Sequence, residues 1–178
     1  MLLRKINAVS SLLCAVFLFA HAILQAVTML SMGSITVNAS VPAWILAGCM
    51  ALHAFISIDL VLSSHLEGEG EKRKCKSYPK LNRTMILQRA SGMLLIVFTL
   101  LHIAGAGGYM QPPQAVHAVL PPLFFAVSLL HTAISVEKAL ITLGIGTAKF
   151  IRTVGISAKV LSAAVLIADI VGFYCYAF

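Results

Sequence analysis

Four histidines of this chain lie inside long apolar stretches, where ionisable side chains are costly and usually functional. They are His21, His53, His102 and His131. A neutral imidazole in such surroundings can bind a metal ion, carry a proton or hydrogen-bond to a neighbouring helix. Because each of four apolar stretches carries one of these histidines, the sequence favours a role that all four share.

The four histidines belong to two sequence patterns that each occur twice. The pattern S-x2-L-x3-F-x3-H spans Ser10–His21 and again Ser91–His102. The pattern H-x2-I-S-[IV]-[DE] spans His53–Asp59 and again His131–Glu137. The offsets are 81 residues for the first pattern and 78 for the second. Two patterns repeated in register indicate a duplicated two-helix unit, of which each copy supplies two histidines.

The elements that carry these patterns are expected to be membrane-spanning helices. Hydrophobic residues make up 60% of the 178 residues and charged residues 11%, and the mean hydropathy is +0.95. Soluble domains carry about 25% charged residues, and about 20 apolar residues cross a bilayer as a helix. The sequence therefore predicts an all-α membrane protein with a single transmembrane domain, 1–178. The five expected spans are 7–32, 41–65, 84–110, 115–141 and 151–177.

The fourth of these spans contains Pro121 and Pro122. Proline removes a backbone donor, and membrane helices tolerate it where neighbours satisfy the freed carbonyl groups. The fourth span is therefore expected to tolerate a kink at these prolines, provided that neighbouring helices satisfy the freed carbonyl groups.

Basic residues predict the orientation of the chain. Segment 66–83 forms a basic loop, and other lysines and arginines precede the first span or surround the turn after the fourth. The loops 33–40 and 111–114 carry none. The positive-inside rule then places the N-terminus and the loop 66–83 in the cytoplasm and the C-terminus outside. The formal net charge of +7 belongs to loops between apolar stretches, so no nucleic-acid partner is expected.

Helical geometry sorts the histidines by depth, because a helix rises about 1.5 Å per residue. His21 and His102 fall in the outer half of the membrane, and we call them the outer couple. His53 and His131 fall centrally or in the inner half, and we call them the inner couple. Two couples at two heights are typical of two b haems, since each iron takes two neutral imidazoles. We therefore expect a four-helix haem-binding bundle with a fifth helix added.

Other roles for the histidines stay open. Zinc and di-iron sites gather their ligands at one height, often beside carboxylates, so they fit less well. A proton relay in a small transporter is one alternative, and structural histidines are another. Four small residues either leave room for a macrocycle or serve close helix packing; they are Ala47, Gly48, Gly92 and Ala126.

The stretch QRASGMLLIVFTLLH, Gln88–His102, resembles the R-x-[ST]-G…H span of cytochrome b subunits from succinate:quinone and quinol:fumarate oxidoreductases. Five spans, with one histidine in each of the first four, resemble their single-subunit two-haem class. The resemblance implies that the inner couple ligates one haem b and the outer couple the other. It also implies quinone binding (menaquinone or ubiquinone), and two partners: a flavoprotein subunit with FAD and an iron–sulfur subunit.

The same resemblance implies a respiratory-chain membrane anchor in a bacterial or archaeal cytoplasmic membrane, which passes electrons between quinone and the iron–sulfur subunit. The basic loop 66–83 then serves either as a docking surface or only as a determinant of topology. Alternatives are the cytochrome b subunit of another quinone-linked enzyme, of the hydrogenase or formate dehydrogenase type, and a small proton-coupled transporter.

Two polar residues near the start of the third span are candidates for binding quinone or a haem propionate. Arg89 offers a guanidinium group, and Ser91, two residues on, a hydroxyl group. The alternative for Arg89 is an ion pair at the membrane interface with Asp59 or Glu137, which lie at a similar predicted height.

Two residues near the outer face are further candidates. Asp169 is a lone acid in the outer part of the fifth span, where it suits proton uptake or release at an outer quinone site. Its alternative is a hydrogen bond to a neighbouring helix. His117 near the outer mouth of the fourth span is a candidate for quinone or propionate contact, or an ordinary interfacial histidine. Two-haem relatives commonly carry an acid in the outer half of the second span, whereas Val41–Leu52 has none.

Overall fold

The computed structural model describes residues 2–38, 40–72, 83–106, 109 and 113–177. Within these ranges the chain is helical apart from short turns, and five helices are long and apolar enough to cross a membrane. The helices are α1 (Leu2–Leu30), α2 (Ser40–Lys72), α3 (Arg83–Ala106), α4 (Gln114–Leu143) and α5 (Ala148–Ala177). The prediction of an all-α protein with five helices of spanning length is confirmed.

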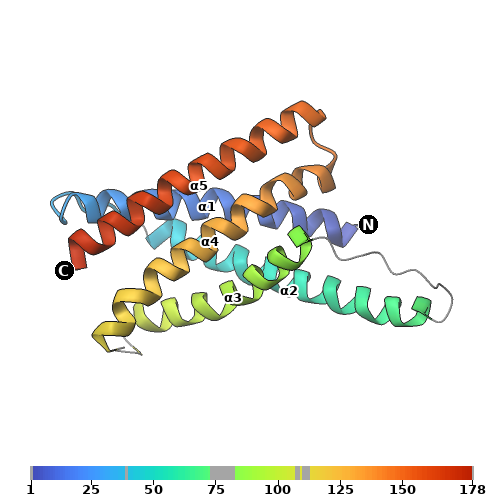
Figure 1. Ribbon diagram of the computed structural model, residues 1–178, viewed down its shortest axis with the longest axis horizontal. Helices are drawn as coiled ribbons and strands as arrows, with labels where there is room; N and C mark the ends of the chain where they lie inside the picture. The colour runs from blue at the N-terminus through green and yellow to red at the C-terminus, as the bar shows by residue number, and fades with distance from the viewer. Residues whose placement is uncertain (1, 39, 73–82, 107–108, 110–112, 178) are drawn as a thin grey trace.

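The helices run side by side in a bundle that has α1 and α4 at its centre (Figure 1). In the described part of the chain, α2 packs extensively only against α1, and α3 only against α4. The pairs α1–α2 and α3–α4 meet through α1 and α4, and α5 covers both central helices. The helices of each repeated pattern, α1 with α2 and α3 with α4, are thus neighbours, and the duplication itself stays a prediction.

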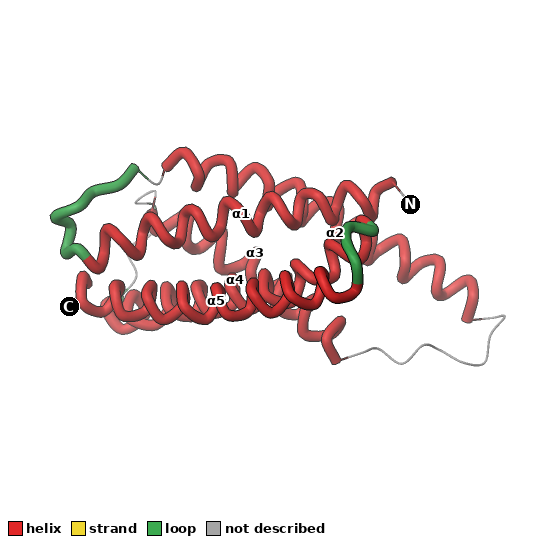
Figure 2. The backbone as a smooth tube through the Cα atoms, turned by 90° about the horizontal axis from the view of Figure 1, so that it is seen from above, coloured by secondary structure: helices red, strands yellow, loops and turns green. Residues whose placement is uncertain are grey.

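The first and last helices show that the chain crosses the bundle an odd number of times. Figure 2 shows α1 beginning at one end of the bundle and α5 ending at the other.

Two clusters of small and branched apolar side chains hold α1, α4 and α5 together, as is common where membrane helices approach closely. The first is Ala15, Val136, Leu140 and Ala158, and the second Ala22, Leu129 and Val165.

Helix α4 continues through Pro121 and Pro122. The missing N–H of Pro122 leaves the carbonyl of Ala118, four residues earlier, without its helical partner. The hydroxyl group of Tyr174 on α5 donates to this carbonyl oxygen at 3.1 Å. The expectation that an adjacent helix satisfies a freed carbonyl is confirmed, and the bond also ties α5 to α4.

The ends of two helices differ in how well the sequence predicts them. Helix α4 stops at Gly144, whose φ of 70° lies in the left-handed region that glycine adopts without strain. Helix α2 instead continues to Lys72, past the predicted span end at 65. Glutamate and lysine are good helix formers, so the helix extends into the stretch EGEGEK. Residues 73–82 of the predicted basic loop lie outside the described part of the chain.

Candidate metal centre

The histidines that helical depth paired interact electrostatically in the structure, although α2 does not pack extensively against α4, nor α1 against α3, in the described ranges. His53 on α2 lies within electrostatic range of His131 on α4. His21 on α1 lies within the same kind of range of His102 on α3. Each couple therefore joins the α1–α2 pair to the α3–α4 pair. The role of these side chains as haem ligands stays a prediction.

Hydrogen bonds hold both rings of the inner couple. Nδ1 of His53 lies 3.3 Å from Oγ of Ser10 and 3.3 Å from the carbonyl oxygen of Asn7, both on α1. Nδ1 of His131 lies 2.9 Å from Oγ of Ser91 on α3. In each case the serine comes from the other helix of the same repeat unit, and in each case it is buried.

Gly92 provides the space that the ring of His131 occupies. A Cβ atom at position 92 would come 3.1 Å from Cε1 of His131, which is closer than a methyl group and a ring carbon normally approach. Gly92 therefore lets α3 lie close against this imidazole. At Gly48, the other candidate glycine, a Cβ would meet nothing within 4 Å, so Gly48 borders open space.

The outer couple has different surroundings. The ring of His102 stacks on the ring of Phe124 of α4, with centroids 5.0 Å apart and an interplanar angle of 28°. His102 is exposed, whereas His21 is half-buried. Thr99, one helical turn before His102, has a buried hydroxyl group without a hydrogen-bond partner among the described residues. An aromatic ring thus contacts His102 of the outer couple, whereas serine hydroxyl groups contact both histidines of the inner couple.

The donor set fits a bis-histidine haem iron. Each couple offers two imidazoles in an apolar bundle, and a bis-histidine iron needs no further protein ligand. Nowhere in the described ranges do three or more histidine, cysteine, aspartate or glutamate side chains gather as a metal site. The bundle also keeps α2 and α3 from packing extensively against each other in these ranges. The inner couple has one histidine on α2 and one on α4, and the outer couple has one on α1 and one on α3.

An ion pair with Glu137 was one alternative for Arg89, and this alternative is wrong. Glu137 pairs with Lys159 of α5, with Oε2 and Nζ 3.5 Å apart. Gly155 makes this approach possible, because a Cβ there would lie 3.0 Å from Oε2 of Glu137. Arg89 and Asp59 are exposed, and neither forms an ion pair with another described residue. Equal predicted height was not sufficient, because Glu137 faces α5 and not α3.

The other three candidates have separate positions. The Ser91 hydroxyl group is engaged with His131 and with the backbone of Gln88. Asp169 is only 1% exposed, and neither of its carboxylate oxygens has a hydrogen-bond partner among the described residues. The alternative of a hydrogen bond to a neighbouring helix therefore finds no support in this part of the chain. The side chain of His117 lies outside the described part.

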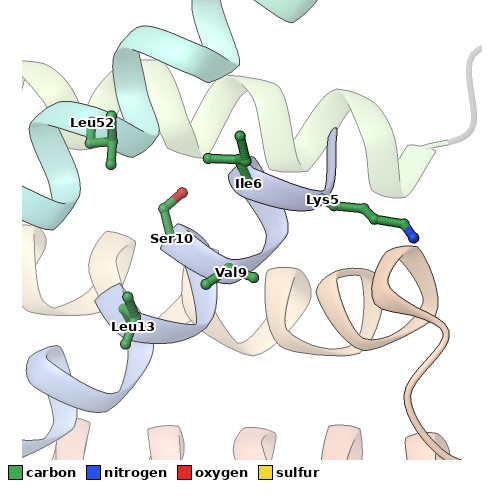
Figure 3. A pocket seen from close by; sticks show the side chains of 6 residues that line it. All are labelled: Lys5, Ile6, Val9, Ser10, Leu13 and Leu52. Carbon is green, nitrogen blue, oxygen red and sulfur yellow. The ribbon is translucent and has the colours of Figure 1, made fainter. Parts of the chain in front are cut away.

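A shallow pocket of about 260 Å³ adjoins the inner couple (Figure 3). Ser10, which contacts the ring of His53, lines it, and so does Leu52, the residue before that histidine. The remaining lining residues are Lys5, Ile6, Val9 and Leu13. The pocket therefore offers a largely apolar surface between α1 and α2, with one ammonium group at its edge.

Sequence reasoning missed the residues that position the inner couple. Ser10 and Ser91 were recognised as members of a repeated pattern, but no contact with a histidine was predicted for either. Asn7 and Gln88, which precede these serines by three residues, were not singled out at all. Their signal was present, because positions 7 and 88 share the offset of 81 residues and both carry side-chain amides.

Comparisons with known proteins identify no relative of this chain. No family model matches this chain, and neither a curated protein nor a solved structure is similar to it.

Proposed function

We propose that this chain is the membrane anchor and di-haem b electron-transfer subunit of a succinate dehydrogenase or fumarate reductase complex. The observation that carries the proposal is the approach of the intramembrane histidines in two couples, His53 with His131 and His21 with His102. Each couple takes one histidine from each copy of the repeated pattern. A bis-imidazole iron requires such pairs.

The residues of the chain have distinct tasks in this proposal. The inner couple and the outer couple would each hold one haem b by their imidazole nitrogens. Bound haem supplies one-electron redox chemistry, with a potential set by ligation, hydrogen bonds and burial. The membrane and the apolar side chains of the bundle would keep the ligands in apolar surroundings. Two haems held at different depths would provide a path for electrons between the two membrane faces.

Partners and orientation follow from the distribution of charge. By the positive-inside rule, the end of the bundle where α1 begins lies in the cytoplasm. An iron–sulfur subunit and an FAD-containing flavoprotein would dock there, close to the inner couple. The exposed guanidinium group of Arg89 at this end is available to a quinone carbonyl or a haem propionate, since no described carboxylate pairs with it.

Asp169 supports a second candidate function. A carboxyl group that is 1% exposed and lacks a described hydrogen-bond partner is suited to binding and releasing a proton. A small proton-coupled transporter would use such a group together with the intramembrane histidines. Within electron transfer, the same group would serve proton exchange at an outer quinone site.

Purification of the chain in detergent from its native membrane distinguishes these functions. The proposal predicts a red preparation, two haems per chain, and α-band absorption with two components after reduction by dithionite. It also predicts co-purification with a flavoprotein and an iron–sulfur protein. A nickel or molybdenum subunit would point to another quinone-linked enzyme, and a colourless preparation would favour transport.

A further inference from the structure

We infer that Ser10 and Ser91 are positioning residues that fix the tautomer and the orientation of both rings of the inner couple. The inference rests on the proposed function for its consequences in haem binding. The hydrogen bonds that carry it are independent of any bound group. They occur twice, at matching positions of the two repeat units.

Ser10 determines where the proton of His53 lies. The Ser10 hydroxyl group donates its single proton to the carbonyl oxygen of Asn7, 2.9 Å away. Its oxygen can then only accept from Nδ1 of His53, at 3.3 Å. The Asn7 carbonyl oxygen, 3.3 Å from the same nitrogen, is also an acceptor. Nδ1 therefore carries the proton, and Nε2 keeps the lone pair that a metal ion requires.

Ser91 acts on His131 in the same way. Its hydroxyl group donates to the carbonyl oxygen of Gln88, 3.1 Å away. Its oxygen, 2.9 Å from Nδ1 of His131, is left to accept the proton of that nitrogen. The two inner histidines thus have the same tautomer for the same reason, and both present Nε2 as the available ligand atom.

A second layer of contacts repeats as well. The side-chain amide of Asn7 accepts from the hydroxyl group of Ser57 at 3.1 Å, and the amide of Gln88 donates to the hydroxyl group of Ser135 at 3.1 Å. Ser57 and Ser135 are the serines of the repeated H-x2-I-S pattern. Ser57 gives its proton to Asn7, and its oxygen lies 3.5 Å from Nε2 of His53, at the limit of hydrogen-bond distance. Nδ1 has two oxygens closer than this, both at 3.3 Å, so the proton is assigned to Nδ1.

The contacts have a defined chemical effect on a ligating imidazole. A hydrogen bond from Nδ1–H to an oxygen raises the basicity of Nε2 and fixes the plane of the ring. A more basic ligand stabilises ferric relative to ferrous iron, which lowers the midpoint potential. Both inner ligands have this support from a serine, and the described ring contact of His102 is with Phe124.

The test uses Ser10→Ala and Ser91→Ala in the purified holoprotein, with Ser128→Ala as the matched control. Ser128 is equally buried on α4, but its hydroxyl group has no partner among the described residues. In a redox titration, each serine-to-alanine variant at the inner couple should raise the midpoint potential of one haem and leave the other unchanged. Haem affinity at that site should fall about 10- to 100-fold. Ser10→Thr and Ser91→Thr, which keep a hydroxyl group, should restore most of both properties.

A nitrogen-15 NMR spectrum of histidine-labelled protein provides a readout that needs no haem. It should show His53 and His131 as Nδ1–H tautomers. Ser91→Ala should lose this preference at His131, and Ser10→Ala should weaken it at His53, where the carbonyl oxygen of Asn7 remains. Potentials and tautomers identical to wild type in both alanine variants would overturn the inference. Wild-type protein without haem would overturn the proposed function instead, and the tautomers would then decide the inference separately.

Discussion

The inner and outer couples differ in how the bundle satisfies polar groups around them. Around His53 and His131, the serine hydroxyl groups and side-chain amides have hydrogen-bond partners. Elsewhere in the bundle, four buried polar side chains have atoms without a partner among the described residues. They are Thr99, Ser128, Ser162 and Asp169.

Among the described residues, this difference concerns the polar groups near the histidines, and it involves serines only at the inner couple. Buried polar groups normally have a partner, and those that do not call for an explanation such as a ligand, water or a catalytic role. The network at the inner couple positions its ligands before any group binds. Thr99, one turn from His102, and Asp169, in the outer part of α5, are the two of these side chains nearest the outer face, which suits a region that is completed by a bound group or by protons.

The largest expected effect concerns the space beside the inner couple. Gly92→Val places a branched side chain where a Cβ alone would already lie 3.1 Å from the ring of His131. We expect the ring to move and the inner haem to be lost, so that haem content falls from two per chain to one. Haem per protein, measured by extraction and absorbance, checks this.

The matched control for that substitution is Gly48→Val, because a Cβ at Gly48 meets nothing within 4 Å. This variant should keep both haems. Equal haem content in the two variants would show that Gly92 does not serve the inner couple.

A smaller effect is expected from the buried acid. Asp169→Val removes a carboxyl group that has no described partner, so we expect the free energy of unfolding to rise by about 1–3 kcal/mol. If Asp169 exchanges protons with quinone, the same variant should lose quinone-dependent electron transfer. Detergent unfolding curves measure the first change, with exposed Asp59→Val expected within about 0.5 kcal/mol of wild type. A destabilised Asp169→Val would mean that the carboxyl group has a partner that this account lacks.

The smallest effect is expected at the aromatic support of the outer couple. Phe124→Leu removes the stacking on His102 and leaves the residue type found at the equivalent position of the first unit, Leu46. The lost aromatic contact should weaken the outer site by about 0.5–1.5 kcal/mol. In a haem-release assay, only the outer haem should dissociate faster. The exposed Phe55→Leu is the control, and faster release of the inner haem would contradict the separation of the two regions.

The sequence predicted the helices and the depths of the histidines, because both depend on apolar length and a fixed helical rise. It could not predict which face of a helix meets which neighbour. That limit explains the partner of Glu137, which is Lys159 and not Arg89. It also explains why the contacts of Ser10 and Ser91 became visible only in three dimensions, although both serines repeat in register with the histidines.

The pairing of the ligands is tested most directly by low-temperature EPR of four oxidised variants, His21→Ala, His53→Ala, His102→Ala and His131→Ala. Wild-type protein should show two low-spin ferric signals. His53→Ala and His131→Ala should each remove the same signal, and His21→Ala and His102→Ala should each remove the other. Loss of different signals in His53→Ala and His131→Ala would contradict the two couples, and so would wild-type protein with no low-spin ferric signal.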